Sequence, residues 1–331
     1  MIGVKCIGKV YKSALAAVSS ALLLSACILH PKAVVKDYET DAYNKNLYKE
    51  KLYASDLCIA SGDVSLDGIS SAVTENLYSA ALFDLDGKKV DFSYNVYEKV
   101  YPASTTKLMT ALIALKYADL SEVVTVSSHA DKDSFAADEQ TCGLETGDRL
   151  TLLDLLYGLL LYSGNDNAVA VAEHIGGTME KFADMMNEEA KKILATGTHF
   201  VNSSGLHDEN HYTTAYDLYL IFHQCMQYDK FMEIISSRSY TADITGADGN
   251  VRQVTWEPTN YYATGEAALP ENATVIGGKT GTTTPAGNCL VLLEEAEDQH
   301  PYISIVMGAD TKTLLYRDMT ALINAIPGDN E

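Results

Sequence analysis

The sequence has 331 residues and is strongly acidic, with 45 Asp and Glu residues against 24 Lys and Arg residues and a formal net charge of −21 at pH 7. A protein with this charge repels polyanions, and no basic stripe interrupts the acidic composition, so a role in nucleic-acid binding is excluded. Hydrophobic residues make up 47% of the chain, which is enough to fill the core of one large domain.

The N-terminal segment is typical of an export signal. Three lysines within the first twelve residues precede an apolar run from Ala14 to Leu24, which is too short to span a membrane. The run ends in Leu24-Ser-Ala-Cys27, which resembles a bacterial lipobox, where the cysteine is acylated after cleavage. We therefore expect residues 1–26 to be a lipoprotein signal peptide and Cys27 to be lipidated. The alternative is an ordinary signal peptide cut near Ala26.

The next segment, residues 27–75, predicts a tether and a transition into the folded domain. It is rich in Tyr, Lys, Asp, Asn and Ser and has no sustained helical or alternating period. We expect residues 28–55 to hold the protein away from a membrane and residues 56–75 to lead into the domain. A single domain is expected over residues 76–331.

The remaining pattern predicts an α+β fold. Leu77–Asp84 and Val90–Tyr94 flank Leu85-Asp-Gly-Lys-Lys89 and predict a β-hairpin. Because two strands precede a helical block and several follow it, the early strands of one antiparallel sheet should pair with late strands. Hydrophobic periodicity predicts helices over Thr105–Tyr117, Leu150–Tyr162, Asn167–Ile175, Met179–Leu194, Ala215–Tyr228 and Tyr316–Ala325, and later strands over Ser237–Asp243, Gly277–Thr280, Asn288–Glu294 and Tyr302–Ala309.

A serine and a lysine lie three residues apart at the start of the first predicted helix. In Tyr101-Pro-Ala-Ser-Thr-Thr-Lys107, Ser104 and Lys107 would share one helical face, so the amine could reach the hydroxyl and act as its base. Backbone N–H groups at a helix N-terminus also suit an oxyanion. The pair alone is weak evidence, because two residue types at a fixed spacing recur by chance about once in a chain of this length.

Two further motifs strengthen this interpretation. Ser163-Gly164-Asn165 follows an apolar run, and Lys279-Thr280-Gly281 lies in a predicted strand. A Ser-x-Asn triplet is common, and Ser93-Tyr94-Asn95 supplies one upstream of Ser104, in the wrong order. Lys-Thr-Gly is rarer, with a chance expectation of about 0.1 per chain. The order Ser-x-x-Lys, Ser-x-Asn, Lys-Thr-Gly is therefore the informative feature.

In this order the three motifs resemble those of the penicillin-recognising serine enzymes. The chain is most similar to the serine-type D-alanyl-D-alanine carboxypeptidases, which are low-molecular-mass penicillin-binding proteins of peptidase family S11. The resemblance implies a β-lactamase/transpeptidase-like fold, with an antiparallel sheet flanked by helices and an all-helical subdomain. It covers roughly residue 77 to the C-terminus and includes Ala80–Asp84, Asn95–Ser104, Leu155–Ala168, Thr198–Leu206, Thr213–Asp217 and Gly277–Thr283.

The resemblance implies an extracytoplasmic enzyme that removes the terminal D-Ala from peptidoglycan stem pentapeptides and is acylated by β-lactams. Ser104 would attack the substrate carbonyl, Lys107 would take its proton, and Ser163 would pass a proton to the leaving amine. No cofactor, metal or nucleotide is implied. The expected substrate-binding residues are Asn165, Lys279, Thr280, Gly281 and Thr282, with Lys279 on the terminal carboxylate and the N–H groups of Ser104 and Thr282 in the oxyanion hole.

Two other functions remain open. A class A β-lactamase is disfavoured because Gly164 stands where those enzymes usually carry Asp, and because no Glu-x-x-x-Asn segment follows. A penicillin-binding sensor or wall-binding module would bind covalently without hydrolysis. Thr280 and Thr282 are also compatible with ordinary strand threonines.

Three remaining features favour structural interpretations. His207 and His211 have a spacing found in zinc sites, but Glu does not follow the first histidine and the segment is typical of a loop, so a metal site is disfavoured. Many relatives add a C-terminal β-domain and a membrane helix, which this sequence lacks, so an N-terminal lipid would provide the anchor. Free or partly paired thiols are expected at Cys58, Cys142, Cys225 and Cys289.

Overall fold

The structure is a computed structural model that describes residues 53–66, 69, 73–297 and 299–326. The expected signal peptide, Cys27 and most of the expected tether lie outside these residues. The chain divides into two compact units, Met1–Ser55 and Asp56–Glu331. Apart from a short 3-10 turn at Tyr53–Asp56, all the elements below belong to the second unit.

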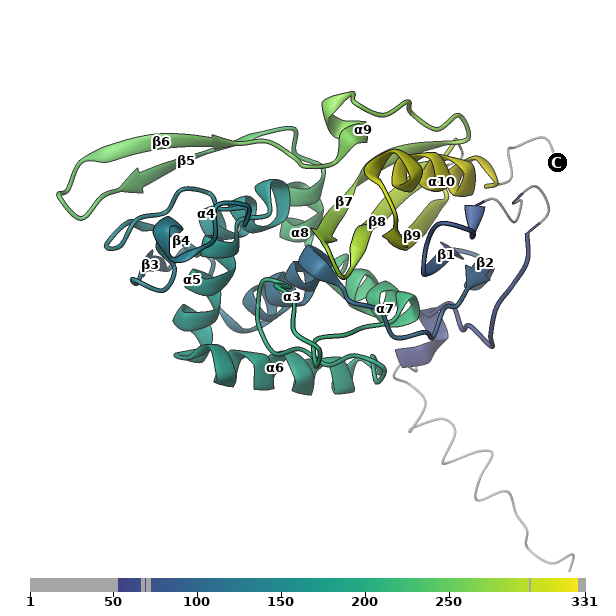
Figure 1. Cartoon of the computed structure of the whole chain (residues 1–331), viewed down its shortest axis with the longest axis horizontal. Helices are drawn as coiled ribbons and strands as arrows, with labels where there is room; N and C mark the ends of the chain where they lie inside the picture. Colours follow the sequence, from purple (N-terminus) through teal and green to yellow (C-terminus); the bar gives the residue numbers. More distant parts are fainter. Residues whose placement is uncertain (1–52, 67–68, 70–72, 298, 327–331) are drawn as a thin grey trace, which may run out of the picture. The chain divides into compact units, whose positions relative to one another are not determined.

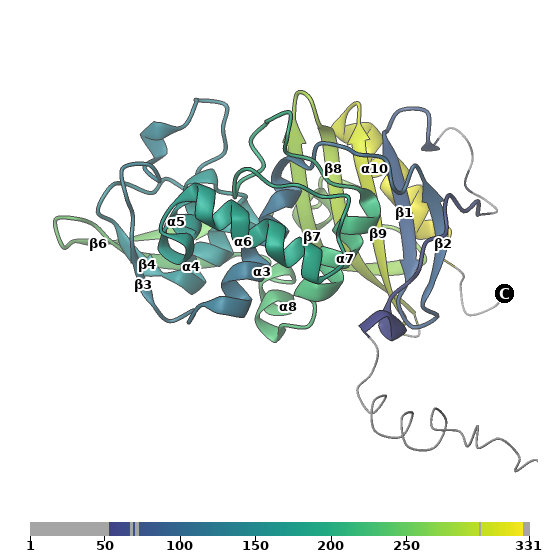
Figure 2. The ribbon, with the colours of Figure 1, turned by 90° about the horizontal axis from the view of Figure 1, so that it is seen from below.

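The second unit is built around a five-stranded antiparallel sheet (Figures 1 and 2). Its order is β2-β1-β9-β8-β7, so the first two strands of the chain lie beside the last. Ala81 of β1 is opposite Ile305 of β9, which confirms the predicted pairing of early with late strands. The strands are β1 (Ser79–Asp84), β2 (Lys89–Tyr94), β7 (Ala273–Thr283), β8 (Gly287–Ala296) and β9 (Pro301–Ala309).

Both faces of the sheet are covered by helices. Helix α10 (Lys312–Asn324) packs on one face, where Met319 contacts a cluster that includes Leu290 and Val306. On the other face, Val291 and Ile305 join the larger core formed with the helical part. Since successive side chains of a strand point to opposite faces, the central strands need apolar residues at nearly every position. This explains why β8 and β9 are mostly apolar, with an unbroken apolar run at Cys289–Leu293 of β8.

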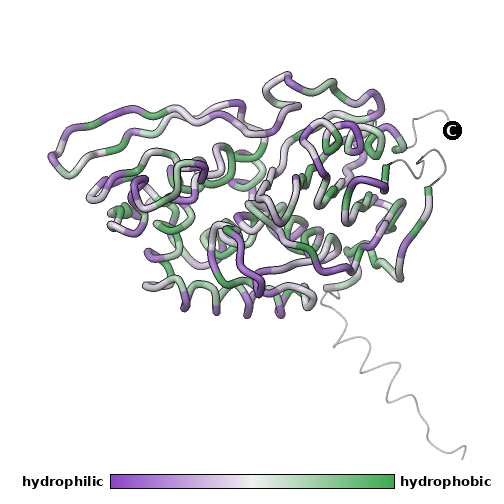
Figure 3. Tube along the Cα trace, viewed as in Figure 1, coloured by the Kyte–Doolittle hydropathy of each residue, from purple (hydrophilic) through white to green (hydrophobic). Residues whose placement is uncertain are grey.

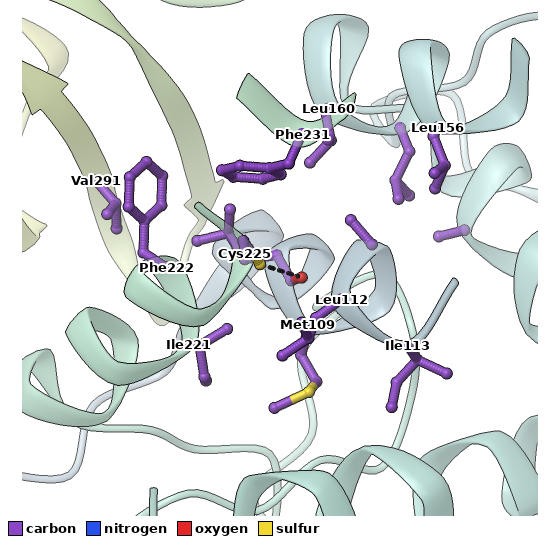
Figure 4. Close-up of a cluster of buried hydrophobic side chains, with 14 of the residues drawn as sticks. Met109, Leu112, Ile113, Leu156, Leu160, Ile221, Phe222, Cys225, Phe231 and Val291 are labelled. Atoms are coloured by element: carbon purple, nitrogen blue, oxygen red, sulfur yellow. Dashed lines mark hydrogen bonds between the residues drawn. The ribbon is translucent and has the colours of Figure 1, made fainter. Parts of the chain in front are cut away.

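The helical part buries its core around α3, as Figure 4 shows. Met109 and Leu112 of α3 lie among Phe222 and Cys225 of α7 and Phe231 of α8, all fully buried. Helix α6 covers this core, and its outward side is hydrophilic (Figure 3). The helices are α3 (Lys107–Tyr117), α4 (Leu152–Tyr157), α5 (Asn165–Gly176), α6 (Met179–Lys192), α7 (Ala215–Cys225) and α8 (Asp229–Ile235).

The helical subdomain also carries a second antiparallel sheet, which the sequence analysis did not expect. Its order is β3-β4-β5-β6, and its strands are β3 (Val123–Thr125), β4 (Arg149–Thr151), β5 (Tyr240–Thr245) and β6 (Val251–Trp256). The helix predicted over residues 150–162 differs from the structure at both ends. Its first residues belong to strand β4, and its last residues form a π-helical segment at Gly158–Tyr162. Short elements complete this unit: η4 (Ala103–Thr106), η5 (Lys132–Ser134) and α9 (Tyr261–Thr264).

Residues 56–66, at the start of the second unit, pack against its core and its five-stranded sheet. Leu57, Cys58 and Ala60 are buried in the main core, and Val64 pairs with Ser93 of β2. In the part of the chain that the structure describes, no helix has both the length and the apolar character needed to cross a bilayer.

Candidate active site

Ser104 lies in the 3-10 turn η4, which leads directly into α3. In a 3-10 turn, residues i and i+3 lie directly above one another, so Lys107 is brought to the face of Ser104. Ala103 holds a left-handed backbone conformation with φ of 48°, which is unusual for a residue with a Cβ atom. The carbonyl of Ala103 packs so closely on Gly205 that a Cβ there would lie 1.8 Å from its oxygen. This packing fixes the conformation of η4, which we call the serine turn.

Lys107 is completely buried, and its amine contacts three oxygen atoms. Nζ lies 2.8 Å from Ser104 Oγ, 2.8 Å from Asn165 Oδ1 and 2.8 Å from the carbonyl oxygen of Ser204. The amide and carbonyl oxygens can only accept hydrogen bonds. A neutral amine would donate its two hydrogens to them and direct its lone pair toward the Ser104 hydroxyl. The geometry therefore suits a lysine that takes the serine proton.

The electrostatic surroundings favour that neutral form. Burial lowers the pKa of Lys107 to about 7, against an opposing effect of Cys142 and Asp166. Removing an ammonium from water is costly, and the three acceptors around Nζ include no carboxylate. Deprotonation of Lys107 is consequently much easier than that of an ordinary surface lysine.

Lys279, on β7, is the second buried lysine of the site and is only 1% exposed. Its Nζ donates to Ser163 Oγ at 2.9 Å and to the carbonyl oxygen of Thr280 at 2.8 Å. Burial lowers its pKa well below the usual range, and the positive charge of Lys107 lowers it further. Because like charges repel, a positive charge on Lys107 disfavours a positive charge on Lys279.

Ser163 and Asn165 come from the junction between the π-helical segment and α5. Ser163 has a left-handed backbone with φ of 71°, and α5 begins at Asn165. A Cβ at Gly164 would lie 2.6 Å from Cys142 Sγ, so glycine allows the close packing of this junction. The junction is held further by Asp166, whose buried carboxylate accepts N–H groups of the preceding loop. Ser163 and Asn165 are thereby fixed toward the two lysines.

Strand β7 approaches the serine turn at Gly281. A Cβ atom there would lie 2.9 Å from the backbone nitrogen of Ser104 and 3.0 Å from that of Thr105. The side chains on either side face different partners: Thr280 Oγ1 is 2.5 Å from Thr259 Oγ1, and Thr282 Oγ1 donates to Asn288 Oδ1 at 3.2 Å.

A cleft of about 490 Å³ opens between these elements. Six residues predicted from the sequence line it, and the two motif lysines lie beneath its surface. The arrangement brings four groups to one opening, as acyl transfer requires. They are the candidate nucleophile Ser104, its candidate base Lys107, the hydroxyl of Ser163 and the edge of β7. The six lining residues are Ser104, Ser163, Asn165, Thr280, Gly281 and Thr282.

Sequence reasoning missed several contributors to the site. Ser204 acts through its backbone carbonyl, which no side-chain pattern reveals, although it lies in the stretch Thr198–Leu206 that carried part of the resemblance. Thr259, Tyr261 and Lys312 also line the cleft, and no motif marks them.

The two histidines of the disfavoured metal motif have different surroundings. His211 is buried, with ring nitrogens 2.8 Å from Thr106 Oγ1 and 3.2 Å from the N–H of Val201. Burial lowers its pKa to about 4. His207 is exposed at the cleft and lies edge-on to Tyr101. The four cysteines of the described residues, Cys58, Cys142, Cys225 and Cys289, are buried free thiols.

The fold and the arrangement of Ser104 and Lys107 suit serine acyl-transfer chemistry with a lysine as the base. Residues 70–311 match the family model of Peptidase S11, D-alanyl-D-alanine carboxypeptidase. The chain is 30% identical over 247 residues to D-alanyl-D-alanine carboxypeptidase DacF of Bacillus subtilis, covering 73% of this chain and 60% of that protein. It is 32% identical over 254 residues to D-alanyl-D-alanine carboxypeptidase DacC of Escherichia coli, covering 73% and 59%.

Solved structures agree with these sequence matches. The crystal structure of the Streptomyces K15 DD-transpeptidase has a TM-score of 0.69 and 26% identity, covering 76% of this chain and 96% of that one. Penicillin binding protein 6B from Escherichia coli has a TM-score of 0.65 and 28% identity, covering 76% and 77%. The chain belongs to the Peptidase S11 family of D-alanyl-D-alanine carboxypeptidases, and it spans about 60% of the length of these curated relatives.

Proposed function

We propose that this protein is a serine-type D-alanyl-D-alanine carboxypeptidase that trims peptidoglycan stem pentapeptides. The observation that carries the proposal is the contact of 2.8 Å between Ser104 Oγ and the amine of a fully buried Lys107. An ordinary surface lysine would be solvated and charged, and so unable to accept a proton. Burial at this position gives the lysine a function as base.

The proposed reaction has two stages. Ser104 Oγ attacks the carbonyl carbon of the penultimate D-alanine while its proton passes to Lys107, and the N–H groups of Ser104 and Thr282 bind the resulting oxyanion. The C–N bond then breaks, and the amine of the terminal D-alanine receives a proton through Ser163. A water molecule then attacks the remaining ester, one of its protons passes to Ser104 Oγ, and the bond between Ser104 Oγ and the carbonyl carbon breaks to release the shortened peptide.

The substrate is proposed to lie along the exposed edge of β7. Asn165 would hold the peptide while keeping Lys107 in place, as its hydrogen bond of 2.8 Å to that amine supports. Lys279 would contact the terminal carboxylate together with Thr280 and Thr282, while Gly281 leaves room for the serine turn. β-Lactams would acylate the same serine, because their strained amide resembles the scissile bond.

The N-terminal segment supports a proposed extracytoplasmic location. Residues 1–26 would be a signal peptide, Cys27 a lipid anchor and residues 27–75 a tether and transition ahead of a catalytic domain at 76–331. These residues of the anchor lie outside the described structure, so the proposal rests on the sequence Leu24-Ser-Ala-Cys27.

The experiment that tests the function uses the full chain with two ligands, an acyl-D-Ala-D-Ala peptide and a fluorescent penicillin. We expect D-alanine release from the peptide and durable labelling by the penicillin, since no base equivalent to the β-lactamase glutamate was found in the sequence. Ser104→Ala should abolish both, and Ser121→Ala, an exposed serine outside the cleft, should change neither.

The same experiment separates the alternatives. Rapid loss of label with consumption of the drug would favour a class A-like β-lactamase. Durable labelling without D-alanine release would favour a penicillin-binding sensor or wall-binding module. Either result would overturn the carboxypeptidase proposal.

A further inference from the structure

His211 is a buried histidine that the proposed reaction does not use. It is 2% exposed, its ring packs edge-on against Phe200, and it does not line the catalytic cleft. A buried polar ring is costly unless its nitrogens are hydrogen-bonded, and both nitrogens of His211 have partners. The two partners belong to the two chain segments that meet at the amine of Lys107.

The first partner lies in the serine turn. Thr106 follows Ser104 by two residues and directly precedes Lys107, and its Oγ1 is 2.8 Å from His211 Nε2. The same hydroxyl lies against the segment behind the turn, since a Cβ at Gly205 would be 2.8 Å from it. Thr106 is fully buried, so water does not compete for the bond. The imidazole therefore holds the turn at the residue next to the base.

The second partner lies in the segment that supplies the Ser204 carbonyl. The N–H of Val201 donates to His211 Nδ1 at 3.2 Å, three residues before the carbonyl that accepts from Lys107 at 2.8 Å. The serine turn thus supplies the hydroxyl that contacts Lys107 Nζ, and residues 201–204 supply one of its acceptors. One imidazole connects these two segments.

The hydrogen bonds define the tautomer of this ring. A backbone N–H can only donate, so His211 Nδ1 carries the lone pair that accepts from Val201. Nε2 then carries the hydrogen and donates it to Thr106 Oγ1. Burial lowers the pKa of His211 to about 4, so the ring keeps this neutral form at the pH where Lys107 titrates.

The backbone that follows His211 is fixed on both sides. Tyr212 exchanges two hydrogen bonds with His199, at 2.8 and 3.0 Å, and Thr213 exchanges two with Val100, at 2.8 and 2.9 Å. Because its backbone is held in this way, the ring has a defined position and can act as a spacer between the turn and residues 201–204.

We propose that His211 is a positioning residue for acyl transfer at Ser104. Its ring sets the separation between the serine turn, held through Thr106, and residues 201–204, held through Val201. The role rests on the proposed carboxypeptidase function, since it concerns the same nucleophile and base. His211 touches no substrate, and its effect reaches the reaction through the position of Ser104 Oγ relative to Lys107 Nζ.

The test measures kcat and KM for D-alanine release from an acyl-D-Ala-D-Ala peptide, together with the second-order rate of labelling by a fluorescent penicillin. His211→Leu removes both hydrogen bonds and keeps an apolar side chain in the core. It should lower kcat by about 10- to 100-fold, the loss expected for a shift of about 1 Å at a reacting centre, and leave KM within about 2-fold. Labelling should slow by a similar factor, because both ligands acylate the same serine.

A conservative variant and a matched control accompany this measurement. His211→Gln should keep kcat within about 3-fold of the wild type, because its amide offers one acceptor and one donor at a separation close to that of the ring nitrogens. His199→Leu is the control, since this ring lies in the same part of the chain and its Nδ1 contacts the carbonyl oxygen of Asn210 at 2.6 Å instead of the serine turn. It should change neither kcat nor KM.

A double-mutant cycle with Thr106→Val tests the route of the effect. Valine keeps the shape of threonine but cannot accept the hydrogen bond from Nε2. Since His211→Leu and Thr106→Val remove the same bond, the double variant should lose clearly less kcat than the product of the two single losses. Losses that multiply in full would overturn the proposal.

The remaining outcomes are equally decisive. A raised KM with unchanged kcat in His211→Leu, an unchanged kcat in Thr106→Val, or a His211→Gln variant as slow as His211→Leu would each overturn the positioning role. If His211→Leu does not fold, Thr106→Val and His211→Gln decide it by the same measurement. If the wild type released no D-alanine, the carboxypeptidase function would fall, and the labelling rates would still test His211.

Discussion

At the scale of single residues, the proposed mechanism depends on a lysine that can act in its neutral form. Lys107 has two neighbours that only accept hydrogen bonds and one hydroxyl that can donate. This asymmetry orients a neutral amine toward Ser104, whereas a charged ammonium would bind all three oxygens equally.

The first prediction concerns pH. Burial lowers the pKa of Lys107 to about 7, and the reaction needs its deprotonated form. The rate of acylation should therefore rise with pH through about 7, level off above 8, and fall about tenfold per unit well below 7. The second-order rate of labelling by a fluorescent penicillin between pH 5.5 and 8.5 measures this. A flat profile, or one that rises toward acid, would contradict the proposed base.

His207 offers a control for this titration. It is exposed at the cleft and has no part in the proposed proton transfer. His207→Gln should leave the inflection near 7 in place. Movement of the inflection in this variant would assign it to the histidine.

The sequence predicted the reactive side chains because their order and spacing are unusual in combination. Ser104, Lys107, Ser163, Asn165 and Lys279 meet at one cleft or directly beneath it. The contribution of Ser204 could not be predicted, because any residue type supplies a backbone carbonyl. Thr259 was also missed, since its contact with Thr280 joins residues 21 positions apart and follows no local pattern.

At the scale of secondary structure elements, the close approach of neighbouring backbone segments to η4 determines the geometry of the site. Gly281 lets β7 come within van der Waals contact of the serine turn, and Gly205 does the same behind Ala103. Side chains at these positions would separate the strand from η4 by displacements of the order of 1 Å. Such shifts at a reacting centre typically cost about 100-fold in rate.

The second prediction concerns the β8–β9 pair, which carries a buried acid outside the site. Glu294 is fully buried on the face toward α10 and accepts a hydrogen bond from Ser304, and its Oε2 has no partner among the described residues. Burial raises its pKa well above its ordinary value of about 4.5. Folding therefore retains a proton that the unfolded chain releases above that value, so this residue makes stability fall as pH rises from 5 to 8.

Glu294→Gln removes the ionisable group that causes this loss of stability, while preserving a side-chain hydrogen bond to Ser304. We expect the free energy of unfolding at pH 8 to rise by about 1–3 kcal/mol and the gain to shrink toward pH 5. Urea unfolding at both pH values provides the measurement. The exposed Glu188→Gln on α6 is the control and should be neutral. An equal effect of Glu294→Gln at both pH values would show that ionisation is not the cause.

The elements were predictable where the hydrophobic pattern is strong: α6 has a clear helical period, and β9 is apolar at most positions. The second sheet was missed because β3 and β4 have three residues each, too few to establish a period. Strand β6 alternates along Val251–Trp256, but exposed polar side chains weaken its hydrophobic signal. The break at Gly158, where an apolar helix changes to a π-helical segment, follows from packing against Asn167 and Cys142 and leaves no local signal.

At the scale of the whole molecule, the proposed anchor precedes the folded unit in the sequence. The motif Leu24-Ser-Ala-Cys27 predicts that a lipid on Cys27 retains the protein at the membrane. The third prediction is that Cys27→Ala leaves penicillin labelling intact but releases the protein from the membrane fraction or blocks its maturation. Fractionation and intact-mass analysis provide the measurement. An unlipidated Cys27 in the mature wild-type protein would reject the anchor.

The central claim is that Ser104 is the nucleophile and Lys107 its base. The most direct measurement is to treat the full chain with benzylpenicillin, digest it with trypsin and locate the adduct by tandem mass spectrometry. We predict the adduct on Ser104, within the peptide from Val100 to Lys107, and its absence from Ser104→Ala. An adduct on Ser163, or one that persists in Ser104→Ala, would contradict the account.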